Sequence, residues 1–376
     1  MTPSKAERSN AQTAGHILGS IKPKDLEGHL KKRFEHVRHC VETKSEERLL
    51  PILLRGSPGI GKSDIIRMAA KKADFSFVDI RLAQMEPVDV RGFPFVVNGQ
   101  MVWLAPTWAQ DMMKSDFGVF VLEEMASAPP AVQVPIYQMV LDHRIGDLQI
   151  KPGWFFIATG NKATDKAIVS PLSSALVSRF KHMELTCSFE NWRPWAIKNG
   201  VAEEVLGYLE RQTDQLFEEP RRETPYTCPR SWTKLSMELK AYGEDFQCRD
   251  AEAIVGPRAI TWWAYKDVYK SLTCAKDIAE GNSVEVPKEP DRFYALISCL
   301  RSYYRENPKK YAPGLLNYLA HLAEKEQKDL KNYGATLLQD MYLINPGAIV
   351  HKDHLDLYKK VSALYAAVGG VGMGYK

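Results

Sequence analysis

Eight consecutive residues have the types and spacing of a phosphate-binding loop, GxxxxGK(S/T). They are Gly56, Ser57, Pro58, Gly59, Ile60, Gly61, Lys62 and Ser63. Glycines let the main chain wrap closely around a phosphate, and main-chain N–H groups at the start of the following helix supply positive potential. We expect the Lys62 ammonium to contact the β- and γ-phosphates and the Ser63 hydroxyl to bind Mg²⁺. The loop therefore predicts ATP and Mg²⁺ as ligands, although its residues do not read the nucleotide base.

Two carboxylates end the apolar run VFVLEE at residues 119–124. A buried strand that ends in this way beside a phosphate-binding loop can supply the remaining chemistry of hydrolysis. Glu123 would hold Mg²⁺ through its water shell, and Glu124 would orient the water that attacks the γ-phosphate.

A third polar element is Asn161, which ends the run WFFIATGN at residues 154–161. Its amide could contact the γ-phosphate and the attacking water. Asparagine is also a common turn former. The hypothesis therefore depends on Asn161 coming third, after the loop and the two carboxylates.

Five short apolar runs alternate with helical or turn-rich segments over residues 45–188: PILLR (51–55), FSFVDIRL (75–82), VFVLEE (119–124), WFFIATGN (154–161) and HMELTC (182–187). Such runs are typical of strands buried on both faces of a parallel sheet. We predict an α/β fold with a five-stranded parallel sheet, whose carboxyl ends bind the ligand.

Beyond Cys187 the apolar spacing becomes helical. We predict a disordered N-terminal segment over 1–20, an α/β nucleotide-binding core over 21–188, a helical lid over 189–280 and a helical C-terminal extension over 281–376. The Gly-rich tail at 367–376 should fray.

The order GSPGIGKS, VFVLEE, ATGN and SSALVSRF resembles the AAA+ ATPases and, within them, the MoxR group. The resemblance implies that Arg179, in SSALVSRF, acts as a finger in the neighbouring subunit's site. It also implies that Arg230, in CPRSW at 228–232, contacts the subunit's own nucleotide. A guanidinium at either place would stabilise charge on the phosphoryl oxygens. Residues 82–106 resemble the group's hairpin insertion, with Asn98-Gly99 as a tight turn.

The resemblance further implies ATP hydrolysis in a homo-oligomer, a hexameric ring, that remodels or activates a partner protein in a chaperone-like way. The partner would be a client or a protein with a von Willebrand factor A domain. The catalytic set would be Glu124, Asn161, Arg179 and Arg230. Glu123 departs from the family, which has Asp there, and we expect its longer side chain to hold the metal less tightly.

Composition narrows the classes of protein to which this chain could belong. Hydrophobic residues make up 45% and charged residues 26% of the chain, which is typical of soluble globular proteins. No apolar run approaches the roughly twenty residues that span a bilayer, and the polar N-terminus is not a secretory signal. We therefore expect no membrane association and a cytoplasmic location. The six cysteines are scattered without CxxC spacing, which predicts reduced thiols and no zinc site.

Other functions stay open. A net charge of +4 without a basic stripe argues against a nucleic-acid motor or a restriction-type NTPase subunit. Tryptophans in the second half could stack on bases, but their helical spacing favours core packing. A nucleotide-gated scaffold with little turnover is compatible with Glu123, whereas a kinase lacks an evident acceptor pocket.

Overall fold

The computed structural model describes residues 19–162, 172–221, 223–283 and 285–366. They form two units. The core unit contains the described residues up to Ser188 together with Glu219–Glu223, and the helical unit contains Phe189–Glu218 and the described residues from Thr224 onward. Residues 1–18 of the predicted disordered segment and the tail at 367–376 lie outside the described residues. The predicted limits of the lid and the extension stay predictions.

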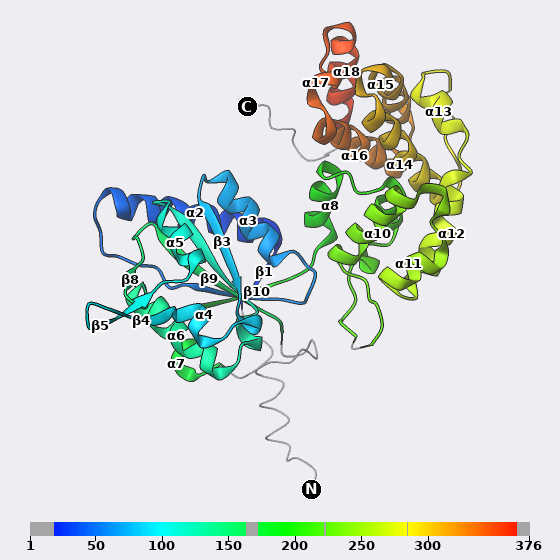
Figure 1. Ribbon diagram of the computed structural model, residues 1–376. Helices are drawn as coiled ribbons and strands as arrows, with labels where there is room; N and C mark the ends of the chain where they lie inside the picture. The colour runs from blue at the N-terminus through cyan, green and yellow to red at the C-terminus, as the bar shows by residue number, and fades with distance from the viewer. Residues whose placement is uncertain (1–18, 163–171, 222, 284, 367–376) are drawn as a thin grey trace, which may run out of the picture. The chain divides into compact units, whose positions relative to one another are not determined.

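The core unit is built on a parallel sheet with the strand order β1-β10-β2-β9-β6-β3 (Figure 1). Its strands are β1 (Ser20–Ile21), β2 (Ile52–Arg55), β3 (Ser76–Arg81), β6 (Gly118–Glu123), β9 (Trp154–Gly160) and β10 (Lys181–Leu185). The predicted α/β class with a parallel sheet is confirmed, and all five apolar runs are strands. The sheet has six strands instead of five, because Ser20 and Ile21, partly assigned to the disordered segment, pair with Glu184 and Leu185. Two residues are too few to produce an apolar run.

Helices cover both faces of this sheet (Figure 1). They are α2 (Pro23–Glu42), α3 (Lys62–Lys72), α4 (Pro87–Arg91), α5 (Thr107–Met113), α6 (Pro130–Asp142) and α7 (Ser174–Val177). Successive side chains of a strand point to opposite faces. Accordingly, Phe155 of β9 packs on Phe34 of α2, whereas Phe156 joins the buried cluster that includes Met112 and Ile136 of α5 and α6. The result is a three-layer arrangement in which β9 is buried along its whole length.

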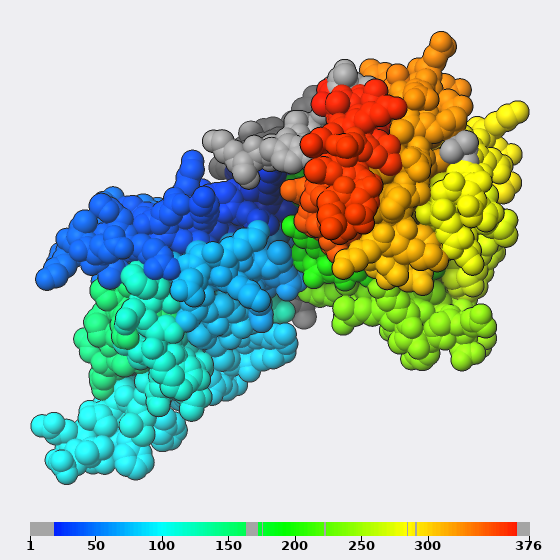
Figure 2. Space-filling model, turned by 90° about the horizontal axis from the view of Figure 1, so that it is seen from above, coloured from blue at the N-terminus to red at the C-terminus, as the bar shows by residue number. Residues whose placement is uncertain are grey.

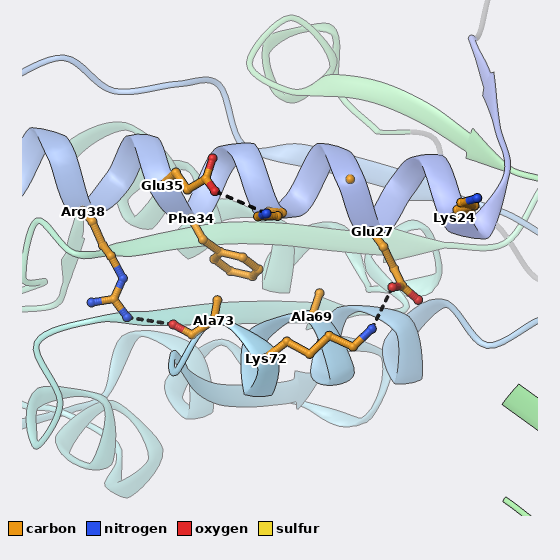
Figure 3. Close-up of a pocket in the computed structure, with 10 residues that line it drawn as sticks. Lys24, Glu27, Phe34, Glu35, Arg38, Ala69, Lys72 and Ala73 are labelled. Atoms are coloured by element: carbon orange, nitrogen blue, oxygen red, sulfur yellow. Dashed lines mark hydrogen bonds and ion pairs between the residues drawn. The ribbon is translucent and has the colours of Figure 1, made fainter. Parts of the chain in front are cut away.

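Helix α2 also holds the helix that follows the phosphate-binding loop. Figure 3 shows the groove of about 480 Å³ between α2 and α3. Lys72 Nζ lies 2.9 Å from Glu27 Oε2, and Arg38 donates to the Ala73 carbonyl oxygen over 2.7 Å. These two contacts bridge the helices, while Phe34 fills the space between them. Helix α3 is thereby fixed along its side as well as at its start.

Two small antiparallel hairpins extend from the core unit. The first joins β4 (Phe93–Val97) to β5 (Gln100–Leu104) and projects from the unit (cyan in Figure 2). Its tip has positive φ at both central residues, 52° at Asn98 and 78° at Gly99, as a tight two-residue hairpin turn requires. The second joins β7 (Arg144–Ile145) to β8 (Leu148–Gln149). Its Asp147 Oδ2 accepts from the Trp103 main-chain N–H over 2.8 Å, which ties the two hairpins together.

All described residues of the helical unit form helices or connections. The helices are α8 (Phe189–Lys198), α9 (Glu203–Arg211), α10 (Pro229–Tyr242), α11 (Cys248–Val255), α12 (Arg258–Lys270), α13 (Cys274–Ala279), α14 (Pro290–Glu306), α15 (Pro308–Glu324), α16 (Lys328–Ile344), α17 (Pro346–Ile349) and α18 (Leu355–Ala366). Trp232 and Trp262 are fully buried, so these two tryptophans pack the core as predicted. Among the described residues, no helix is both long and apolar enough to cross a membrane.

Six charged side chains gather inside the helical unit, where they join α8, α9, α14 and α16. Arg301, fully buried, contacts Glu203, Glu210 and Asp340 over 2.5–2.8 Å. Arg193 bridges Glu210 and Asp340, and Arg305 contacts Glu203. Three cations and three carboxylates therefore balance one another, and we call this set the buried ion network. Burial alone would raise the pKa of Glu210, but Arg301 and Arg193 hold it below its usual value.

Candidate nucleotide-binding site

The predicted phosphate-binding loop connects β2 to α3, and its glycines are needed for different reasons. Gly59 and Gly61 have φ of 79° and 90°, a region that side chains with a Cβ rarely adopt. A Cβ at Gly56 would lie 2.7 Å from Ile60 Cδ1 and 3.0 Å from the Leu185 carbonyl oxygen, so the Ile60 side chain would have to move to admit one. The Gly56 N–H donates to the Gly160 carbonyl oxygen over 3.1 Å. The loop is therefore attached to the end of β9 from its first residue.

Lys62 lies over this loop and reaches the neighbouring strand end. Its Nζ donates to the carbonyl oxygens of Gly56 at 2.6 Å and Ser57 at 3.1 Å, and lies 3.5 Å from Asn161 Oδ1. An ammonium has three donors and no acceptor. The structure thus brings together two of the predicted residues, Lys62 and Asn161, that lie 99 positions apart in the sequence.

Of the two predicted carboxylates, Glu123 ends β6, which borders β9 on the side away from β2, and Glu124 follows it. Glu123 is half-buried, and its Oε2 accepts a hydrogen bond from Thr159 Oγ1 over 2.8 Å. Glu124 is exposed and left-handed, with φ of 57° and ψ of 35°, and it starts the 3-10 turn Met125–Ser127. Its main-chain N–H donates to the same Thr159 hydroxyl over 3.3 Å. Sequence reasoning missed Thr159, although a polar side chain inside an apolar run two positions before Asn161 was a usable signal.

The sheet edge at this point is rich in cations. Lys162 follows Asn161, and its Nζ lies 2.5 Å from Glu184 Oε1 on β10. Arg55 ends β2 opposite Glu184 in the register. Burial lowers the pKa of Arg55, and the Glu184 carboxylate partly offsets this. Glu184 balances the charge of Lys162, so this pair links β9 to β10, and Lys62 is the cation that we expect to contact the phosphates. Neither Lys162 nor Arg55 belongs to a motif that the sequence alone reveals.

The oxygen atoms here fit Mg²⁺ better than a tightly chelated metal. Among the described residues, no group of three or more His, Cys, Asp or Glu side chains is arranged to hold a metal ion. Mg²⁺ is usually bound by one or two protein oxygens, several waters and the substrate's phosphates. Ser63, in the first turn of α3, and Glu123, at the end of β6, are such oxygen donors. These are the two residues that would hold the ion.

The predicted arginines lie elsewhere. Arg179 is half-buried between α7 and β10. Because Lys181 of β10 is opposite Ile52, Arg179 precedes the amino end of the sheet, whereas the loop follows its carboxyl end at Arg55. At roughly 3.3 Å per residue, the strand between these edges is about 13 Å long. Arg230 is the exposed second residue of α10 in the helical unit. Its contact with the nucleotide stays a prediction.

Comparison with known proteins finds only distant likeness. No model of a protein family matches the sequence, and no curated protein matches it. The structure is similar to that of the RuvB Holliday junction branch migration motor of Thermotoga maritima, with 17% identity, 77% of this chain and 87% of that chain covered, and a TM-score of 0.34. A point mutant of the same RuvB has 15% identity, with 77% of this chain and 88% of that chain covered and a TM-score of 0.36. NtrX from Brucella abortus in complex with ADP has 13% identity, with 89% of this chain and 68% of that chain covered and a TM-score of 0.34. At such similarity, interpretation of the site rests on its own geometry.

Proposed function

We propose that this chain is an ATPase of the AAA+ type, within the MoxR group, that works in an oligomeric ring and remodels a partner protein. The observation that carries the ATPase proposal is the meeting of four parts at one sheet edge. The loop follows β2, Asn161 follows β9, Glu123 ends β6 and Glu124 follows it, and these three strands are adjacent. A P-loop without the other parts would support nucleotide binding alone.

Each residue has a role that its position supports. Main-chain N–H groups of the loop and the Lys62 ammonium bind the phosphates. Glu124 orients the attacking water and takes up its proton, and the Asn161 amide, beside Lys62, orients the γ-phosphate. Mg²⁺, when bound, neutralises part of the phosphate charge. Arg230 remains a candidate contact to the subunit's own nucleotide.

The position of Arg179 supports the ring. It precedes the amino end of β10, whereas the loop lies at the carboxyl ends of the same parallel strands. An arginine placed there is poorly situated for its own loop, and the resemblance assigns it to the site of a neighbouring subunit. A homo-oligomeric ring, for which we propose six subunits from the resemblance, would place it in the adjacent site.

The β4–β5 hairpin supports contact with a partner protein. Its apolar side chains are unusually exposed: 62% for Phe93, 54% for Phe95, 67% for Val96 and 66% for Met101. Contiguous exposed apolar surface often marks protein–protein contact. That the partner is a client or a von Willebrand factor A domain protein rests on the resemblance alone.

The ATPase proposal is tested with Glu124→Gln. Because only water activation is removed, ATP affinity should stay at the wild-type value while turnover falls about 10²- to 10⁴-fold. Calorimetry measures the first quantity and phosphate release the second. Glu46→Gln, at an exposed glutamate of the same unit, should change neither. Equal loss of binding and turnover would make Glu124 a structural residue, and turnover that requires DNA or RNA would favour a nucleic-acid motor.

The partner proposal is tested in the Glu124→Gln background, which should hold ATP and retain the partner. Native extract is passed over this protein and over the same protein with Phe95→Ser and Met101→Ser. Both hairpin changes lie on exposed side chains, so folding and ATP binding should persist while the captured protein is lost. Equal capture by both proteins would exclude the hairpin as the contact.

A further inference from the structure

The carboxyl end of β9 connects the separate parts of the site through three consecutive residues. Asn161 lies beside the Lys62 ammonium, and Gly160 accepts a hydrogen bond from the N–H of Gly56, the first loop residue. Thr159 contacts both carboxylate residues at the end of β6. This follows from the strand order, because β9 lies between β2 and β6. Asn161 contacts Lys62 and Gly160 attaches the loop, whereas the two contacts of Thr159 have no function assigned to them.

We infer that Thr159 is a positioning residue for Glu123 and Glu124, an inference that rests on the proposed ATPase function. Its hydroxyl donates to Glu123 Oε2 over 2.8 Å and accepts from the Glu124 main-chain N–H over 3.3 Å. A hydroxyl can do both at once, since it has one donor and two acceptor lone pairs. Thr159 is 1% exposed, so water does not compete for these bonds.

The strand register explains why this residue, and not another, meets the Glu123 carboxylate and the Glu124 main chain. The last registered pair of β6 and β9 is Leu122 opposite Ala158. One step further along the two parallel strands, Glu123 lies alongside Thr159. A β-branched side chain has few χ1 choices in a strand, so the hydroxyl is held in a fixed direction. The contact with Glu123 is thus set by two strands.

Thr159 also anchors an unusual main-chain conformation. Glu124 is left-handed although it is not glycine, and the following turn buries Met125 and Ala126. Such a conformation persists where its surroundings fix it. The hydrogen bond from the Glu124 N–H to Thr159 fixes the first residue of the turn. The exposed Glu124 side chain therefore starts from an anchored main chain.

The same contact accounts for the glutamate at position 123. Its side chain is one methylene longer than that of the aspartate usual in the resembling family, and one carboxylate oxygen is held by the Thr159 hydroxyl. The contact restricts the longer chain and leaves the second oxygen for the metal's water shell. We therefore expect the hydroxyl to matter with Glu123 and to matter much less with an aspartate there.

The test uses Thr159→Val, which keeps the shape and removes the hydroxyl, and Thr159→Ser, which keeps the hydroxyl. Binding of a fluorescent ATP analogue without metal should match the wild type in both variants. The Kd of Mn²⁺ for the complex with a non-hydrolysable ATP analogue, measured by electron paramagnetic resonance, should rise about 10- to 100-fold in Thr159→Val, with a similar fall in kcat. Thr159→Ser should restore most of both. Introducing Thr159→Val into Glu123→Asp should add little to the effect of Glu123→Asp alone.

Unchanged Mn²⁺ affinity in Thr159→Val, or equal losses in the Val and Ser variants, would overturn the inference. If Thr159→Val does not fold, Thr159→Ala, which also removes the hydroxyl, is measured in the wild-type chain and in the Glu123→Asp chain. A rise in the Mn²⁺ Kd in the first chain with little change in the second supports the inference, and equal changes in both overturn it. A wild-type chain that binds nucleotide without hydrolysing it would overturn the ATPase proposal, while the Mn²⁺ measurement would still decide the role of Thr159. A wild-type chain that binds no nucleotide would overturn both.

Discussion

Charged side chains gather at the strand ends of the core unit and at the centre of the helical unit, and their partners differ. In the buried ion network, Arg301 meets three carboxylates, and each carboxylate meets two arginines. At the strand ends, the hydrogen bonds of Lys62 go to main-chain carbonyls and an amide, and Glu123 accepts from a hydroxyl. Opposite charges neutralise each other. Neutral partners orient a charge without cancelling it, whereas Lys162 and Glu184 at the same edge neutralise each other.

The comparison teaches that charge clustering and burial do not by themselves locate a functional site. The buried ion network has the deepest burial and strong pKa shifts, yet its groups are saturated by one another. A buried pair of this kind is costly to break, because the remaining partner is left without compensation in a low-dielectric interior. Substitutions should therefore affect folding in the helical unit and chemistry in the core unit.

The largest expected effect is on turnover, through Arg179. If it acts in the adjacent subunit, Arg179→Ala should lower kcat by on the order of 10³ or more while the chain's own loop still binds ATP. Mixed with Glu124→Gln protein, it should regain activity, since the Gln chain can supply its arginine to an intact Arg179→Ala site. Phosphate release is measured after subunit exchange. No recovery in mixed oligomers detected by native mass spectrometry would exclude action between subunits.

The next effect is on stability, through Arg301→Met. Methionine keeps much of the volume but leaves Glu203, Glu210 and Asp340 with only Arg193 and Arg305. We expect unfolding of the helical unit to become easier by about 3–5 kcal/mol, measured by urea denaturation followed by tryptophan fluorescence. Lys310→Met removes an exposed pair with Glu280 and should change little. Equal effects of the two changes would mean that burial does not distinguish the pairs.

Lys62→Ala should have the opposite effect to Arg301→Met, because it should weaken ATP binding and leave stability almost unchanged. Removing the charge that contacts the phosphates should weaken ATP binding by about 2–5 kcal/mol, a roughly 30-fold to several-thousand-fold rise in Kd. Stability should stay within about 0.5 kcal/mol of the wild type, since the lost hydrogen bonds lie at a half-buried surface. Calorimetry and urea denaturation give the two numbers. Lys72→Ala, on the same helix but paired with Glu27, should leave ATP affinity unchanged.

These two regions also differ in how far the sequence predicts them. The loop, Glu123, Glu124 and Asn161 were found because each is contiguous with an apolar run that becomes a strand. Thr159 stands out in the sequence only as a polar residue inside an apolar run, and the register is needed to show which residues it contacts. The buried ion network was missed because its members, such as Arg193 and Asp340, lie up to 147 positions apart with no local pattern. Strand β1 was missed because it has two residues.

The smallest expected effect concerns acid, and it depends on His143 in the core unit. The ring packs on Phe156 at 5.1 Å between centroids, and Nδ1 is buried without a hydrogen-bond partner among the described residues. Burial, assisted by the Arg48 charge, lowers the pKa of His143 to about 4. In the unfolded chain the histidine has a pKa near 6.5, so below that pH the folded chain binds fewer protons than the unfolded chain. The contribution of His143 to stability is therefore complete above pH 6.5. It is lost as the pH falls to about 4, and amounts to at most about 3 kcal/mol.

In the helical unit, Arg301 and Arg193 hold the pKa of Glu210 below its unfolded value of about 4.3, so its contribution to stability is lost only below that pH. Burial raises the pKa of Glu203, and a carboxyl group with a raised pKa removes no stability as the pH falls. The core unit should therefore lose stability first on acidification.

His143→Asn keeps a residue type that tolerates the left-handed φ of 51° there and removes the titration. Its free energy of unfolding should start lower, because volume is lost, and then vary less between pH 6.5 and 4 than that of the wild type. In the control His39→Asn, at an exposed histidine, the free energy of unfolding should vary with pH as it does in the wild type. Parallel pH profiles for wild type and His143→Asn would contradict the assignment, as would helical-unit unfolding that precedes core-unit unfolding above pH 4.3.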